Sequence, residues 1–376
     1  MSNILCLYWG NPTFYPYIIE KLKFLNKKRR IYFVSRSYKD FFYKKKFLNS
    51  LCNSFAIWHL ENKILHTLTF VLFILLSFYI LIFKNIKIVI LYDRNATLFF
   101  FIAKILKKKI IYHNFDYNPE VISLKKNFKL FIITKIEKVC AKYSDLLIFS
   151  HSFRAKKFLL NNKINKKYVV AYNGPSLDNK HNVKEIPKKK IKVIWTGTLG
   201  KGHALENIIR SFNYLDNKFN LTIICHYVFS KNEYLDYLKK LIISNNLSHR
   251  IKIFTTFNYE NFIEELNKSH IGLAIYEPIN LSHRHMMGAS NKINFYIKYS
   301  LPIVLSRIKE NINFIKKYKN GVNVTHKDPQ TIARGIRKIT KNNFNYKKMS
   351  LNSFTIFKNE FNFYKKFKII EKFLNE

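Results

Sequence analysis

The stretch over residues 270–304, HIGLAIYEPINLSHRHMMGASNKINFYIKYSLPIV, decides the fold of this chain. It opens with an apolar run typical of a buried strand and then passes through a polar loop. A helix-like alternation of apolar and basic residues follows, and a second strand-like run closes the stretch. A strand, a helix and a strand in this order predict a βαβ unit with parallel strands.

The same alternation continues on both sides of this stretch. It covers the first half of the chain, stops in a polar, proline-containing stretch and then restarts. We therefore predict an α/β fold with two Rossmann-like domains, over 1–175 and 191–345, joined by a linker at 176–190. A helical segment over 346–376 has no strand partner. The predicted strands are 4–10, 29–36, 86–93, 109–115, 145–150, 168–173, 191–197, 220–227, 250–257, 270–278 and the run beginning at 301.

The charge is extreme, with 66 Lys and Arg against 23 Asp and Glu and a net charge of +43. Such an excess favours an anionic partner, either nucleic acid or a phospholipid surface, although a general enrichment in Lys, Asn, Ile, Phe and Tyr accounts for part of it. The lysines are scattered, and no aromatic RNA-binding pattern occurs. We therefore expect no nucleic-acid partner, and keep a nucleic-acid-binding protein only as a less favoured alternative.

The cysteines and the N-terminus indicate the compartment. The four cysteines are far apart and form no CxxC pair, so the sequence predicts neither a zinc site nor a disulfide framework. The N-terminal residues lack the pattern of a secretory signal. We expect a cytoplasmic protein.

Residues 64–83 form an uncharged apolar run that is long enough to span a bilayer. Its polar members, such as His66 and Ser77, and the strand-like run that follows favour a buried or membrane-lying helix over a true span. The stretches 38–51 and 104–109 combine lysines with apolar or aromatic residues, as interfacial segments do. A solvated charged surface explains each of them as well. Together they favour a peripheral location on the inner face of the cell membrane, with an anionic membrane surface as partner.

Three motifs, in this order and spacing, resemble the GT-B glycosyltransferases, most closely family 4 of bacterial surface-polysaccharide synthesis. They are YNG at 172–174, VIWTGTLGKG at 193–202 and the opening stretch. The resemblance implies two domains facing a cleft and a C-terminal helix that crosses back to the first domain. It also implies transfer of a sugar from a nucleotide sugar, with retention and without a metal or other cofactor, to a polyprenyl-linked or glycan acceptor in capsule or O-antigen synthesis.

Ligands of doubly wound sheets bind at the carboxyl ends of the strands, which directs attention to the turns there. A glycine-spaced turn before a helix can hold a diphosphate, because its N–H groups and the helix dipole favour an anion. In 286–292 the small loop residues lead to a predicted N-cap at Ser290. The donor-binding candidates are Gly10, Asn11, Thr198, Gly200, Lys201, Gly202, Gly288, Ser290, Asn291 and Lys292.

Three further residues at strand ends are candidate catalytic groups. His113 could hydrogen-bond a sugar hydroxyl, Asp93 could orient the acceptor, and Glu277 is the one carboxylate of the donor loop. For the first two, capping of a strand or helix end is an alternative. The basic loop 283–285 either contacts phosphate or is simply exposed.

The chain departs from the resemblance at one position. Many family 4 members carry a second glutamate in the donor-site helix, and Phe295 stands at the matching position. This leaves two interpretations: an enzyme that binds its donor without that carboxylate, or a non-catalytic scaffold with the same fold.

Overall fold

The computed structural model describes residues 3–12, 16–37, 49–58, 63–117, 119, 128–176, 183–187, 189–200, 202–225, 232–255 and 258–375. The chain divides into two compact units. Unit 1 comprises Met1–Asn173 together with Lys366–Glu376, and unit 2 comprises Gly174–Lys365.

Unit 1 is built on a seven-stranded sheet with the strand order β3-β2-β1-β4-β5-β6-β7, and its paired strands are parallel. The order reverses between β1 and β4, which is where such sheets bind ligands. The central strands are apolar on both faces because helices cover both. The strands are β1 (Asn3–Tyr8), β2 (Ile31–Ser37), β3 (Asn53–Trp58), β4 (Ile86–Tyr92), β5 (Lys109–Asn114), β6 (Leu146–Phe149) and β7 (Val169–Val170).

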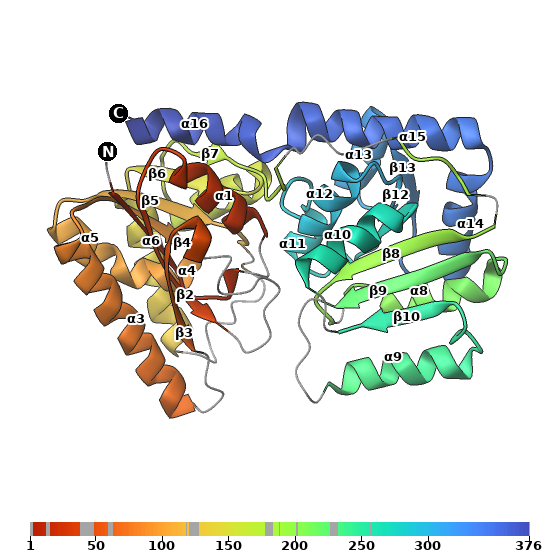
Figure 1. Cartoon of the computed structure of the whole chain (residues 1–376), viewed down its shortest axis with the longest axis horizontal. Helices are drawn as coiled ribbons and strands as arrows, with labels where there is room; N and C mark the ends of the chain where they lie inside the picture. Colours follow the sequence, from red (N-terminus) through yellow and green to blue (C-terminus); the bar gives the residue numbers. More distant parts are fainter. Residues whose placement is uncertain are drawn as a thin grey trace. The chain divides into compact units, whose positions relative to one another are not determined.

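The helices of unit 1 lie on the two faces of this sheet (Figure 1). The crossovers from β3 to β4 and from β4 to β5 advance in one direction through the sheet, while that from β1 to β2 runs in the opposite direction. Right-handed crossovers therefore put α3 and α5 on one face and α1 on the other. The helices are α1 (Pro16–Asn26), α3 (Lys63–Phe83), α4 (Asp93–Ala96), the 3₁₀ turn η2 (Thr97–Phe99), α5 (Phe100–Ile105), α6 (Phe128–Tyr143) and α7 (Ser152–Asn162).

Unit 2 has a six-stranded parallel sheet with the order β10-β9-β8-β11-β12-β13. The strands are β8 (Ile191–Gly197), β9 (Phe219–Cys225), β10 (Ile251–Phe254), β11 (Ile271–Ala274), β12 (Ile303–Ser306) and β13 (Gly321–Val324). The helical elements are α8 (Leu205–Ser211), η5 (Phe212–Tyr214), α9 (Glu233–Ser244), α10 (Tyr259–Lys268), α11 (Leu281–Arg284), α12 (Asn291–Lys298), α13 (Lys309–Tyr318), α14 (Pro329–Thr340), α15 (Asn343–Ile356) and η6 (Phe357–Phe361). Helix α16 (Phe363–Asn375) begins in unit 2 and continues into unit 1.

The end of the chain belongs to both units. The last part of α16 packs on unit 1, where the Phe367 ring lies 4.8 Å from that of Phe24 and Lys28 forms an ion pair with Glu371 at 2.9 Å. The sequence suggested a single helix over 346–376, but the structure divides this segment into α15, η6 and α16. Asn362 adopts an extended conformation and its side chain accepts a hydrogen bond from the N–H of Lys365, so it ends η6 and caps α16.

Candidate active site

The opening stretch folds as predicted, with β11, a loop, α12 and β12 in order, and β11 lies next to β8 in the sheet. Ser290 is the N-cap residue of α12, but its side chain makes no capping hydrogen bond. The Ser290 hydroxyl lies 3.4 Å from that of Tyr276 instead. The N-terminus of this helix therefore keeps backbone N–H groups that a ligand can use.

Lys292, in the first turn of α12, is the central cation of this region. Its side chain is only 6% exposed, and Nζ lies 4.0 Å from the ring centre of Trp195 and 4.8 Å from that of Tyr276. Among the described residues, Nζ has no hydrogen-bond acceptor. Burial lowers the pKa of Lys292 well below its ordinary value. An ammonium group desolvated in this way favours an anion as its missing partner.

Two histidines extend the cluster around Lys292. The ring of His203 lies 5.1 Å from that of Tyr276 and 5.3 Å from that of His283. Burial and the charges of Lys292 and His283 lower the pKa of His203 to about 2, so its ring is neutral at physiological pH. Its Nδ1 is buried and has no hydrogen-bond partner in the part of the chain that is described. A neutral imidazole can hydrogen-bond a ligand without adding charge.

Two glycines, Gly197 at the end of β8 and Gly202 in the turn that follows, allow close approach to this cluster. Gly202 has φ +91°, and a Cβ there would lie 2.8 Å from His283 Cε1, so a side chain is excluded. A Cβ on Gly197 would lie 3.1 Å from Lys292 Nζ. The carbonyl of Gly202 accepts a hydrogen bond from the N–H of Glu277 at 2.9 Å. The glycine turn and the donor loop are therefore joined by a backbone hydrogen bond.

The remaining candidates of this turn have varied surroundings. Thr198 is exposed, and a Cβ on Gly200 would meet no atom within 4 Å. Lys201 lies outside the described residues, so its contact with phosphate stays a prediction. Asn291 is partly buried. The backbone of Glu277 forms hydrogen bonds, through its N–H to the Gly202 carbonyl and through its carbonyl to His283 Nδ1.

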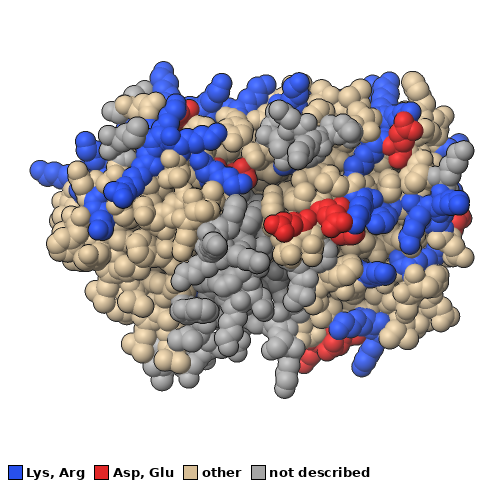
Figure 2. All heavy atoms as spheres, in the orientation of Figure 1, with Lys and Arg blue, Asp and Glu red and all other residues tan. Residues whose placement is uncertain are grey.

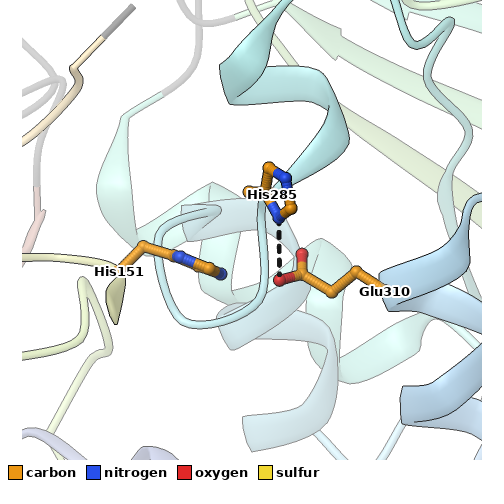
Figure 3. A group of neighbouring side chains, drawn as sticks. All are labelled: His151, His285 and Glu310. Carbon is orange, nitrogen blue, oxygen red and sulfur yellow. Dashed lines mark ion pairs between the residues drawn. The ribbon is translucent and has the colours of Figure 1, made fainter. Parts of the chain in front are cut away.

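Glu310, in the first turn of α13, fixes the loop that leads to α12. Its carboxylate accepts hydrogen bonds from the N–H groups of Met286 at 2.7 Å and Met287 at 3.2 Å, and it lies 3.5 Å from His285 Nδ1 (Figure 3). Gly288 follows with φ +82°. His151, also labelled in Figure 3, belongs to unit 1, where its Nδ1 accepts a hydrogen bond from the N–H of Phe153 and caps α7.

The sequence did not indicate three residues of this region: Trp195, Tyr276 and Glu310. Only Trp195 carried a signal, as a tryptophan two residues before the glycine that ends a strand. Phe295, where the resemblance expects a glutamate, is 2% exposed and packs against Phe262 with ring centres 5.1 Å apart. In this chain, that helix position belongs to the core.

In unit 1, Asp93 follows β4 and begins α4 with φ +63°. Burial and the nearby carboxylate of Glu137 raise its pKa to about 7. Glu137 is 2% exposed and is held by Arg94 Nε at 2.8 Å and by the Tyr112 hydroxyl at 2.5 Å. Asp93 thus exchanges its proton near neutral pH, as a catalytic base requires.

His113 lies at the end of β5, as predicted, but its side chain is only 1% exposed. Each of its ring nitrogens lies 3.2 Å from Lys21 Nζ, and its ring packs on that of Phe115 at 4.7 Å. Burial, and then the Lys21 charge, lower the pKa of His113 well below its ordinary value. Its described partners are protein groups, so a contact with a sugar stays a prediction.

Gly10 and Asn11 form the turn after β1. The Gly10 N–H donates to the Tyr8 carbonyl at 2.9 Å, and its carbonyl accepts from the Arg36 N–H at 3.1 Å. Asn11 is 2% exposed. Because both hydrogen bonds of Gly10 join it to the strands of unit 1, this turn has a structural role whether or not it contacts a ligand.

The raised pKa of Asp93 predicts a pH-dependent stability. Its folded pKa of about 7 exceeds the ordinary aspartate pKa of 3.8, so the favourable contribution present at low pH is lost as the pH rises from about 4 through 7. Asp93→Asn should remove this loss, and asparagine also tolerates the positive φ. Allowing for partial exposure, we expect the variant to gain roughly 2 kcal/mol over wild type at pH 8. Urea unfolding at pH 4 and pH 8 measures it, and an equal difference at both pH values would contradict the assignment.

Comparisons with known proteins bear on this architecture. No family model matches the chain. A Methanocaldococcus jannaschii protein named as an uncharacterized glycosyltransferase is 28% identical over 290 residues, which cover 74% of this chain and 71% of that relative.

Two solved structures are similar over the whole chain. HepE from Anabaena, solved in complex with UDP and glucose, has a TM-score of 0.73 at 14% identity, with 100% of both chains covered. Sucrose-phosphate synthase from Thermosynechococcus elongatus has a TM-score of 0.72 at 10% identity, covering 100% of this chain and 98% of that chain. These similarities confirm the predicted fold class: the chain has the GT-B fold, and it is an enzyme of the glycosyltransferase class.

Proposed function

We propose that this protein transfers a sugar from a nucleotide-sugar donor to a lipid-linked or glycan acceptor. The observation that carries the proposal is Lys292, a buried cation without a hydrogen-bond acceptor among the described residues, in the first turn of α12. A diphosphate there would pair with the ammonium group and with the free N–H groups of the helix. The lysine is unfavourable without such a ligand and favourable with it.

The donor would occupy unit 2. Its diphosphate would lie at Ser290 and Lys292, and its approach would use the space left by Gly197 and Gly200. The neutral His203 is placed near the same cluster and can donate a hydrogen bond to the sugar or to a phosphate oxygen. HepE, which has a similar fold, was solved with UDP-glucose, which supports a uridine nucleotide as the first donor to test.

Unit 1 would receive the acceptor, with Asp93 as the group that accepts the proton of its hydroxyl. A carboxyl group whose pKa is about 7 is basic enough to accept that proton and is largely ionised above this pH. The acceptor oxygen would then form the new bond to the anomeric carbon on the same face from which the nucleoside diphosphate leaves with the bonding electrons, because attack on the opposite face would invert the configuration. We propose retention of the anomeric configuration, and no metal or cofactor, because the resemblance to family 4 implies both.

The wider role is proposed on the same resemblance. We propose that the enzyme adds a sugar during assembly of a surface polysaccharide, on the cytoplasmic side of the cell membrane. The motifs that carry this proposal are the glycine turn over 193–202 and the donor-site stretch over 270–304.

A ligand screen with the purified protein tests the proposal. UDP-glucose, UDP-galactose, UDP-N-acetylglucosamine and GDP-mannose are added singly, and the melting temperature is recorded, with a short RNA as the competing anion. We expect one or more nucleotide sugars to raise the melting temperature, because a ligand that binds the folded state stabilises it. Stabilisation by the RNA and by none of the sugars would overturn the proposal. Binding without release of the nucleoside diphosphate, in the presence of lipid-linked acceptors, would favour the non-catalytic scaffold.

A further inference from the structure

Helix α3 has two apolar faces, of which unit 1 buries only one. The inner face packs on the sheet through Phe73 and Ile80, which are 0% and 1% exposed, and the Phe73 ring lies 5.1 Å from that of Trp9. The outer face, as we call it, consists of large apolar side chains that are each 41% to 67% exposed. Its members are Leu65, Leu68, Val71, Leu72, Leu75, Phe78, Tyr79, Ile82 and Phe83.

This surface extends beyond α3. Helix α5 lies on the same side of the sheet, and its Phe101 and Ile105 are 45% and 77% exposed. Figure 2 shows a broad tan area over α3 and α5, with the blue lysine and arginine side chains of unit 1 gathered along its upper edge. Isolated apolar side chains are common on protein surfaces, but a continuous apolar stripe over several helical turns marks an interaction surface.

A cationic depression lies where α3 ends. It measures about 440 Å³ and is lined by Arg30 and Lys84 together with the aromatic side chains of Tyr32, Phe55 and Phe83. Phe83 is also the last member of the outer face, so the depression adjoins the apolar stripe. The sequence over 63–92 contains no acidic residue.

A basic, aromatic edge beside an apolar stripe matches the anionic headgroups and acyl chains of a bilayer. We propose that the outer face of α3, continued by Phe101 and Ile105, inserts into the surface of an anionic bilayer, with Arg30 and Lys84 beside a lipid phosphate. The helix lies in the membrane surface and does not cross it, because Phe73 and Ile80 remain in the core of unit 1. A second copy of the chain is a poorer occupant, since it would bring two basic edges together.

This surface is separate from Lys292 and its neighbours in unit 2, so its test is independent of the donor site. The protein is sedimented with phosphatidylcholine vesicles and with vesicles in which about a third of the lipid is phosphatidylglycerol. We expect binding to both, with the anionic vesicles bound at least about tenfold more tightly at low salt.

Two pairs of substitutions separate the apolar and the cationic contributions. Leu72→Gln with Leu75→Gln should weaken binding to both kinds of vesicle by at least about tenfold. Arg30→Ala with Lys84→Ala should lower the preference for anionic over neutral vesicles by about tenfold. The reason is that each cation close to an anionic surface adds its own attraction to the lipid.

Matched controls come from exposed residues of unit 2. Ile243 and Leu351, which are 66% and 49% exposed, are changed to glutamine, and the exposed Lys239 and Lys240 to alanine. These variants should bind vesicles as the wild type does. Equal loss in the controls, or unchanged binding in the α3 variant, would overturn the proposal.

Two further outcomes would each replace the proposal with another occupant or arrangement. Dimerisation without vesicles, abolished by the Leu72 and Leu75 substitutions, would assign the outer face to a second copy. Resistance to alkaline carbonate extraction from native membranes would indicate a spanning helix, whereas a surface-bound protein is released. The far-ultraviolet circular dichroism and melting temperature of each variant establish that it is folded before its binding is compared.

Discussion

Replacing Lys292 with methionine is expected to weaken nucleotide-sugar binding by about 10- to 100-fold, because a hydrogen bond to a charged group contributes roughly 1.5 to 3 kcal/mol. The same change should leave the free protein as stable as the wild type or more stable. Methionine fills a similar volume between Trp195 and Tyr276 and removes a buried ammonium group that has no hydrogen-bond acceptor in the described chain. Isothermal calorimetry and thermal melting without ligand measure the two effects.

A second buried lysine on the same helix gives the matched control. Lys298 is 2% exposed and lies in the last turn of α12, where the helix dipole favours a cation. Lys298→Met should leave donor affinity within about twofold of wild type, because its charge lies at the other end of α12, about two turns from the proposed phosphate. If both variants lose affinity equally, the loss reflects damage to α12, and Lys292 would have no special role in binding the donor.

The second large effect is expected from Asp93→Asn. Removing the proposed base should lower turnover by about 10²- to 10⁴-fold, with donor affinity unchanged. Wild-type turnover should rise as the pH increases through about 7, because the carboxylate form is the active one. The variant should lose this rise. Initial rates of nucleoside diphosphate release between pH 5.5 and pH 9 provide the measurement.

Asp236→Asn controls for the loss of an acidic group elsewhere. Asp236 is exposed on α9 in unit 2, so its substitution should change neither turnover nor the pH profile. A wild-type profile that is flat through pH 7, or an Asp93→Asn variant with near-normal turnover, would exclude Asp93 as the base. The stability measurement at pH 4 and pH 8 would still report whether its carboxyl group titrates as assigned.

The architecture was readable from the sequence because parallel strands buried on both faces appear as short apolar runs at regular intervals. The βαβ unit over 270–304 is the clearest example, and Ser290 is the N-cap residue as predicted, although its side chain makes no capping hydrogen bond. Element boundaries were less accurate. The predicted strand over 270–278, for example, ends at Ala274 in the structure.

The environment of each site residue could not be predicted in the same way. Lys292 is buried between the aromatic rings of Trp195 and Tyr276, which lie far apart in sequence. The contact of His113 with Lys21 likewise joins distant parts of the sequence. The raised pKa of Asp93 depends on Glu137, which lies on α6, more than forty residues away. Residue types at strand ends nominate candidates, whereas tertiary contacts decide how exposed and how ionised they are.

The return of α16 to unit 1 has a consequence for the order in which the protein is made. Residues 366–376 leave the ribosome after the whole of unit 2, yet Phe367 and Ile370 are buried in unit 1. During synthesis, the apolar surface of unit 1 near Phe24 therefore stays uncovered until residues 174–365, which form unit 2, have been made. Transiently exposed apolar surface promotes aggregation, so unit 1 is more prone to aggregate before residues 366–376 have been made than after.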